Sequence, residues 1–179
     1  LALLVAGALA ELAWVLAEQG DYAGAEERSL KALEAAERSG DPARQAGVLV
    51  GLGRQARLQG ETGVSLAYMQ QALTLFEQAG DRTGAARTAN NIGIAHSLRG
   101  EFDQAMRAFR QGVAVFQELG QREDVADGLN NIGIVYRRQG QLDLAFEHFR
   151  QSLAPVGDNL ALSALIGLLP LIVVFLLLG

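Results

Sequence analysis

The chain has 179 residues, 50% of them hydrophobic, which is enough for one domain with an apolar core. It contains no cysteine, so disulfides, thiolate metal sites and thiol nucleophiles are excluded. Its formal net charge of −5 argues against the broad basic surface that nonspecific nucleic-acid binding requires, and we predict no nucleic-acid partner. Among its 15 basic residues only Lys31 is a lysine, which favours a GC-rich bacterial gene.

Glycines divide the chain at regular intervals. Glycine adopts the left-handed conformation that follows a helix C-terminus, so each of them is predicted to end a helix. At the second such site Asp41 is the expected N-cap of the next helix, and Pro42 lies in its first turn. One set of glycines recurs every 40 residues and a second set lies midway: Gly20, Gly60, Gly100 and Gly140, with Gly40, Gly80 and Gly120.

Eight amphipathic helices are predicted between these glycines, because apolar residues recur there at helical spacing. In chain order they cover residues 4–19, 22–39, 42–59, 62–79, 82–99, 102–119, 123–139 and 142–154. They pair as helix A and helix B of four repeats, at about 1–40, 41–80, 81–120 and 121–158. Positions 40 residues apart are therefore equivalent.

The A helices share a motif in which a large apolar residue precedes a small one. It occurs as Leu12-Ala13, Leu52-Gly53, Ile92-Gly93 and Ile132-Gly133, and the last two repeats add ANNIGIAH and LNNIGIVY. This pattern resembles the tetratricopeptide repeat, whose usual length is about 34 residues. The longer period is similar to that of kinesin light chains and related bacterial regulatory proteins. The resemblance implies an all-α, right-handed solenoid of four helix-turn-helix repeats over residues 1–158.

In tetratricopeptide stacks the A helices line a concave groove, so the resemblance implies a surface that binds a protein or an extended peptide. Recurring asparagine pairs can donate to and accept from a peptide backbone, and the arginines favour acidic ligands. The alternatives are that Trp14 packs within the first repeat and that Asn90 and Asn130 only satisfy neighbouring helix groups. The candidate residues are Trp14, Arg54, Arg57, Arg87, Asn90, Asn91, Ile94, Asn130, Asn131, Ile134 and Arg137, with Asp127 beside them.

No motif indicates catalysis, a cofactor or a metal site. Gly51 and Gly53 form a GxGxxA arrangement typical of dinucleotide loops, but no strand precedes it. Gly53 instead aligns with Gly93 and Gly133, at the small position where two helices are predicted to approach closely. His96 and His148 have no partners at ligand spacing, which favours packing or solvent exposure. We predict a scaffold or adaptor that is not an enzyme. The alternative is a regulatory or sensor fragment of a larger signalling enzyme.

Residues 159–179 are predicted to form an apolar C-terminal helix. Residues 160–178 carry no charge and would span about 28 Å as a helix, close to the roughly 30 Å hydrocarbon core of a bilayer. Arg137, Arg138 and Arg150 lie on the repeat side, which favours repeats in the cytoplasm. A membrane anchor is the expected role, with a buried helix, a dimer-forming helix or an artefact at a fragment's end as alternatives. Self-association is left open.

Overall fold

The protein is described by a computed structural model over residues 2–153, with side chains from residue 4 onward. No strand occurs within this range. The predicted helices are confirmed, and their boundaries shift by at most two residues. The described helices are α1 (Ala2–Glu18), α2 (Tyr22–Ser39), α3 (Pro42–Leu58), α4 (Thr62–Ala79), α5 (Arg82–Leu98), α6 (Phe102–Glu118), α7 (Arg122–Arg138) and α8 (Leu142–Leu153).

The turns follow the local chemistry that the sequence predicts. Gly40 has φ 68° and its N–H bonds to the carbonyl of Glu37, as expected for a helix that ends in the left-handed conformation. Asp41 then caps α3 by accepting from the N–H of Arg44 at 3.2 Å, and Pro42 lies in the first turn. Positive φ angles occur at all seven predicted helix ends: Gly20, Gly40, Gly60, Gly80, Gly100, Gly120 and Gly140.

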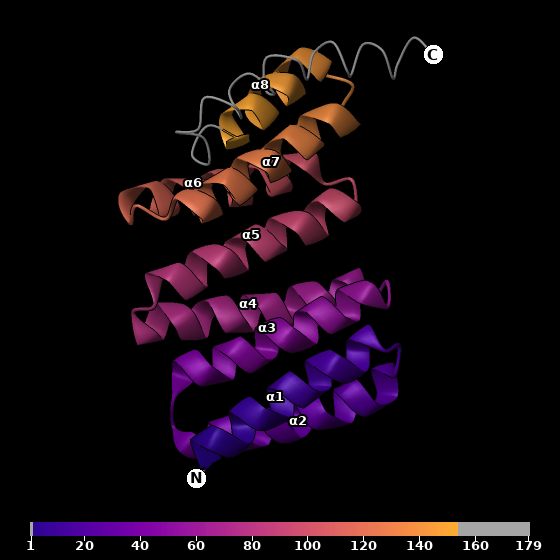
Figure 1. The fold of residues 1–179 in the computed structure, drawn as a ribbon, viewed down its shortest axis with the longest axis vertical. Helices are drawn as coiled ribbons and strands as arrows, with labels where there is room; N and C mark the ends of the chain where they lie inside the picture. The colour runs from indigo at the N-terminus through magenta and orange to yellow at the C-terminus, as the bar shows by residue number, and fades with distance from the viewer. Residues whose placement is uncertain (1, 154–179) are drawn as a thin grey trace. The chain divides into compact units, whose positions relative to one another are not determined.

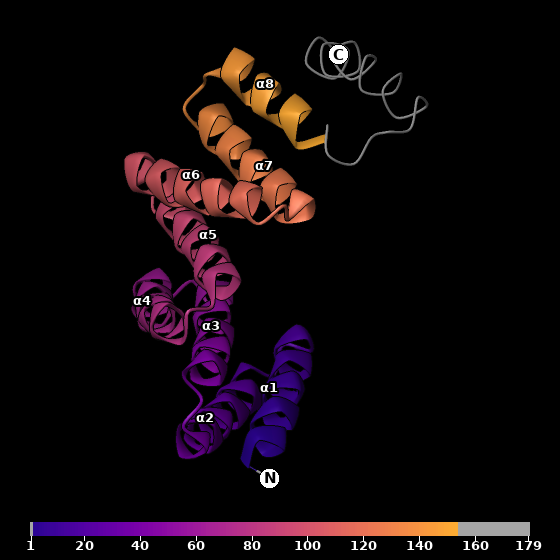
Figure 2. The same cartoon turned by 90° about the vertical axis from the view of Figure 1, so that its left-hand side faces the viewer.

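The chain divides into two compact units, Leu1–Gln111 and Gly112–Gly179, with the division inside α6. In the first unit each helix packs on the next from α1 to α5, and α3 also contacts both α1 and α5. Figure 1 shows α3 between these two helices, and Figure 2 shows α1 and α4 on different sides of α3. The three A helices of the first unit are therefore direct neighbours.

Small residues let helices A and B of one repeat approach closely. In the third repeat a Cβ added at Gly93 would lie 2.6 Å from Cε1 of Phe109, which is 1% exposed. In the second repeat a Cβ at Gly53 would lie 2.8 Å from Cε of Met69. The packing role predicted for the small position is confirmed, and Gly53 lies inside a helix, as the repeat pattern predicts and a dinucleotide loop would not allow.

The second unit contains the end of α6 together with α7 and α8, which pack against each other. A Cβ added at Gly133 of α7 would lie 2.6 Å from Cε1 of Phe149, so the glycine leaves room for this ring. Tyr136 and His148 stack with ring centroids 5.2 Å apart and planes inclined by 14°. This unit therefore repeats the close A-to-B packing of the third repeat.

The predicted apolar helix over 159–179 lies outside the described residues. Within 2–153, none of the helices combines the length and the apolar character needed to cross a bilayer.

Candidate functional site

Three neighbouring hollows mark the first unit where α1, α3 and α5 adjoin. The largest, about 420 Å³, lies between α1 and α3 and reaches Phe76 of α4. A second, about 270 Å³, lies between α3 and α5 and also reaches Phe76. A small one of about 40 Å³ lies beside Trp14. All three are lined by Gly47, and we call them together the α3 groove.

Two glycines form the floor of the α3 groove. Gly47 and Gly51 are four residues apart and so lie on one face of α3. Both are exposed, and a Cβ added at either would meet no atom within 4 Å. The position equivalent to Gly47 in the third repeat holds Arg87. The second repeat therefore lacks, at this point of the groove, the side chain that the third repeat has.

Trp14 forms one wall of the small hollow and contacts the second repeat. The guanidinium carbon of Arg54 lies 4.2 Å from the centroid of its ring, within the range of a cation–π contact. Burial lowers the pKa of Arg54, and the positive charge of Arg57 adds to this effect while Glu18 opposes it. The indole is still 37% exposed. Trp14 and Arg54 therefore present a flat surface to solvent that joins two repeats.

The other candidate residues of the first unit lie on α3 and α5. Arg87 and Asn91 line the hollow between these helices, and Arg87 is exposed. Asn90, Ile94 and Arg57 are half-buried and do not line the three hollows. The structure thus brings Trp14, Arg87 and Asn91 to the α3 groove.

The remaining candidates lie on α7 in the second unit. Asn130 and Arg137 are exposed, whereas Asn131 and Ile134 are half-buried. Since Asn90 and Asn130 belong to different units, the asparagine ladder that the sequence suggests stays a prediction.

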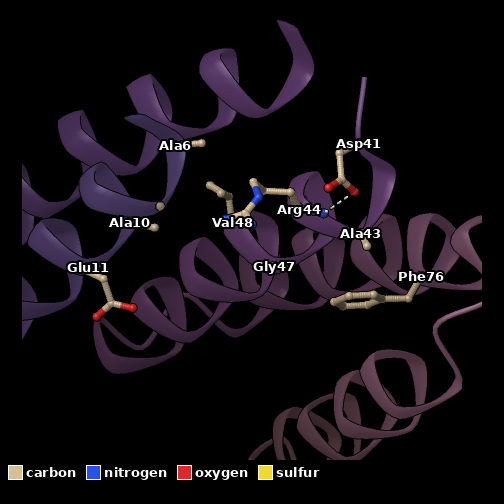
Figure 3. A pocket seen from close by; sticks show the side chains of 10 residues that line it. Ala6, Ala10, Glu11, Asp41, Ala43, Arg44, Gly47, Val48 and Phe76 are labelled. Carbon is tan, nitrogen blue, oxygen red and sulfur yellow. Dashed lines mark hydrogen bonds between the residues drawn. The ribbon is translucent and has the colours of Figure 1, made fainter. Parts of the chain in front are cut away.

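Arg44 lines the largest of the three hollows and was not among the residues predicted from the sequence. Its Nε is buried and has no hydrogen-bond partner among the described residues. Its Nη1 lies 3.4 Å from where a Cβ at Gly7 of α1 would stand. In Figure 3 the Arg44 side chain extends toward Ala6 and Val48. A signal for this hollow was present in the sequence, because glycine occupies equivalent positions 7 and 47 in the first two repeats only.

The two histidines have neighbours of their own. Nδ1 of His96 lies 2.6 Å from Oε2 of Glu101, whose other oxygen pairs with Arg99 at 2.9 Å. His148 stacks on a tyrosine, as described above. Within residues 2–153, no group of three or more histidine and acidic side chains is placed to hold a metal ion.

Two family models, both described as tetratricopeptide repeat, match most of the chain. One matches residues 44–118 and the other matches residues 5–39 and 125–154. The chain belongs to the tetratricopeptide repeat family, as its repeat pattern predicts. Comparison with the curated proteins finds no match.

Solved structures share the fold. The crystal structure of BtubC (BKLC) from P. vanneervenii is 26% identical, with a TM-score of 0.74 over 84% of this chain and 63% of that one. TPR-like repeats ascribed to a kinesin light chain from Podosopora anserina are 16% identical, with a TM-score of 0.69 over 82% of this chain and 72% of that one. The predicted all-α repeat solenoid is confirmed.

A third structure comes from a Signal Transduction ATPase with Numerous Domains protein with a tetratricopeptide repeat sensor, from Pyrococcus horikoshii. It is 12% identical, with a TM-score of 0.77 over 87% of this chain and 24% of that one. The chain thus spans less than two thirds of BtubC and about a quarter of this ATPase.

Proposed function

We propose that the chain is a non-catalytic scaffold or adaptor that binds an extended segment of another protein in the α3 groove. The observation that carries this proposal is that three neighbouring hollows all border on Gly47 of α3. A hollow of about 420 Å³ is within the size range of ligand sites, which is about 300–1,000 Å³. The bare backbone at Gly47 and Gly51 lets a bound chain approach α3 closely.

The groove also offers the chemistry that an extended peptide needs. Arg87 and Asn91 carry donors for peptide carbonyls, and the asparagine can accept from peptide N–H groups. The Trp14 ring offers an apolar face for a partner side chain. Peptide binding therefore has both polar and apolar support within the first unit.

Charge favours an acidic partner. Four arginines lie on or beside the groove: Arg44, Arg54, Arg57 and Arg87. Three carboxylates line it, those of Glu11, Asp41 and Asp81, and the last two are engaged in capping α3 and α5 by accepting from backbone N–H groups. Attraction between these arginines and an acidic segment speeds association and weakens as salt is added.

The proposal can be tested by panning a random peptide library against the immobilised full chain and measuring the affinity of a selected peptide by calorimetry. Arg87→Ala combined with Asn91→Ala should weaken binding several-fold, because each lost hydrogen bond costs about 0.5–1.5 kcal/mol. The matched control is Arg107→Ala on α6, an exposed arginine outside the three hollows. Selected peptides that bind the double variant and the unchanged chain equally well would remove the groove from the proposal.

A second candidate is that the repeats form the sensor part of a larger signalling enzyme. The signal-transduction ATPase from Pyrococcus horikoshii has a tetratricopeptide repeat sensor and shares this fold. The complete reading frame tests this candidate: a catalytic domain encoded with the repeats would support it, and its absence would leave the adaptor.

We further propose that residues 160–178 tether the repeats to a membrane, with the repeats in the cytoplasm. The support is the uncharged apolar sequence of this segment. The full chain should sediment with membranes and resist carbonate extraction, whereas a variant that lacks residues 159–179 should stay in the supernatant. A full chain that carbonate releases from membranes would contradict the tether.

A further inference from the structure

We propose that the hollow of about 420 Å³ between α1 and α3 binds one acidic side chain of a bound peptide, with the Arg44 guanidinium as its counter-ion. This inference rests on the proposed function and specifies the kind of peptide that the α3 groove selects.

The state of Arg44 is the first support. Its Nε is buried without a hydrogen-bond partner among the described residues. A guanidinium stays protonated, so this donor is both charged and unsatisfied in the structure. Arg44 as a whole is only half-buried and lines the hollow, so its guanidinium can donate a charge-assisted hydrogen bond to a carboxylate that enters there. An aspartate or glutamate of the partner supplies that acceptor.

The shape of the hollow is the second support. Gly7 and Gly47 place no side chain in it, while Ala6, Ala10 and Phe76 give it apolar walls. In Figure 3 Ala6 and Ala10 lie on one side of the Arg44 side chain and Phe76 lies on the other. Apolar walls suit the methylene groups of a glutamate, and they strengthen its attraction to Arg44 by excluding water.

Two acidic residues also line this hollow, and they limit its charge preference. Asp41 uses its Oδ1 to accept from the backbone N–H of Arg44 at 3.2 Å. Glu11 is exposed and lies apart from Arg44 in Figure 3. Both carboxylates repel further negative charge, so the hollow is suited to one acidic side chain and not to an acidic run.

Arg44 is not a residue that the repeat itself requires. The equivalent positions in the other repeats hold Leu4, Gly84 and Asp124. Because the packing of these repeats proceeds without an arginine at this position, Arg44 is better explained by ligand specificity than by the fold.

The test uses peptide libraries of ten residues in which a central position is fixed as Glu, Gln, Lys or Leu and the others are random. The unchanged full chain should retain the Glu library about tenfold more strongly than the Gln library, which corresponds to about 1.4 kcal/mol. Arg44→Gln keeps a side chain of similar size without the charge, and it should abolish this preference. Arg44→Lys should restore part of it.

A second variant separates binding from folding. Gly47→Leu places a side chain at the hollow, where its Cβ meets no atom within 4 Å, and it improves helix propensity. It should reduce retention of the Glu library at least tenfold while the melting temperature stays the same or rises. Gly63→Leu on α4 is the matched control, because that glycine is also exposed with open space around it, and retention should not change.

The outcomes distinguish this inference from the proposed function. If peptides bind but the Glu preference survives in Arg44→Gln, the acidic subsite is overturned and the groove proposal stands on its other residues. If Gly47→Leu binds every library fully, both the subsite and the α3 groove are overturned, because Gly47 lines all three hollows. If the unchanged chain retains none of the libraries, peptide binding itself fails and the subsite fails with it.

Discussion

Arg54 occupies the position equivalent to Trp14 one repeat later, and its guanidinium carbon lies 4.2 Å from the centroid of the Trp14 ring. The same position in two successive repeats thus forms a cation–π pair across the boundary between the first and second repeats. The contact helps to hold α1 beside α3 and forms one edge of the α3 groove.

A double-mutant cycle should measure this contact. Trp14→Leu and Arg54→Gln should show a coupling energy of about 0.5–1 kcal/mol in denaturant unfolding, as for a partly exposed cation–π pair. Trp14→Leu combined with Arg107→Gln on α6 provides the control, and those two effects should add. Equal coupling in both cycles would mean that the stacking contributes nothing specific.

Equivalent leucines should differ sharply in their contribution to stability. Leu52 is 3% exposed, whereas Leu12 is 44% exposed. Leu52→Ala should lower the free energy of unfolding by about 2–5 kcal/mol, because it removes buried methylenes and leaves a cavity. Leu12→Ala should cost less than about 1 kcal/mol. Urea titrations followed by circular dichroism compare the two, and similar costs would contradict the burial of Leu52.

Glycine-to-alanine changes at two positions of the A helices should alter the stability of the protein in opposite directions. At Gly93 the added methyl would lie 2.6 Å from Phe109, so Gly93→Ala should destabilise the protein by about 1–3 kcal/mol. At Gly51 the space is open, and Gly51→Ala should stabilise it by about 0.5–1 kcal/mol through helix propensity. Thermal unfolding provides the measurement. A stabilised Gly93→Ala variant would show that α5 and α6 pack less closely than described.

Gln55 links the first two repeats through buried hydrogen bonds. Its Nε2 donates to the carbonyl of Tyr22 at 2.8 Å, its Oε1 accepts from Ser29 at 3.5 Å, and it is 6% exposed. Gln55→Ala should lower the free energy of unfolding by about 1–3 kcal/mol, because buried partners lose their bonds. The exposed Gln71 provides the control, and Gln71→Ala should change little. A comparable loss in both variants would show that these bonds are not responsible.

The local sequence determined where the helices begin and end, and its repeat pattern indicated the family. Gly40 and Asp41 act within a few residues of themselves, since a left-handed glycine ends one helix and an aspartate caps the next. The 40-residue period then states which positions are equivalent, which is how the packing role of Gly93 could be predicted before its contact with Phe109 was seen.

Tertiary structure alone decided what each A-helix residue faces. Equivalent positions 14 and 54 pair with each other, and Gly47 opens a hollow where the third repeat has Arg87. Nε of Arg44 lies buried without an acceptor among residues 2–153. None of these follows from the period, because burial and pairing depend on the side chains that the neighbouring helices place around each residue. The repeat pattern therefore predicted the scaffold, while the α3 groove and its unsatisfied arginine arise from differences between repeats that only packing in space reveals.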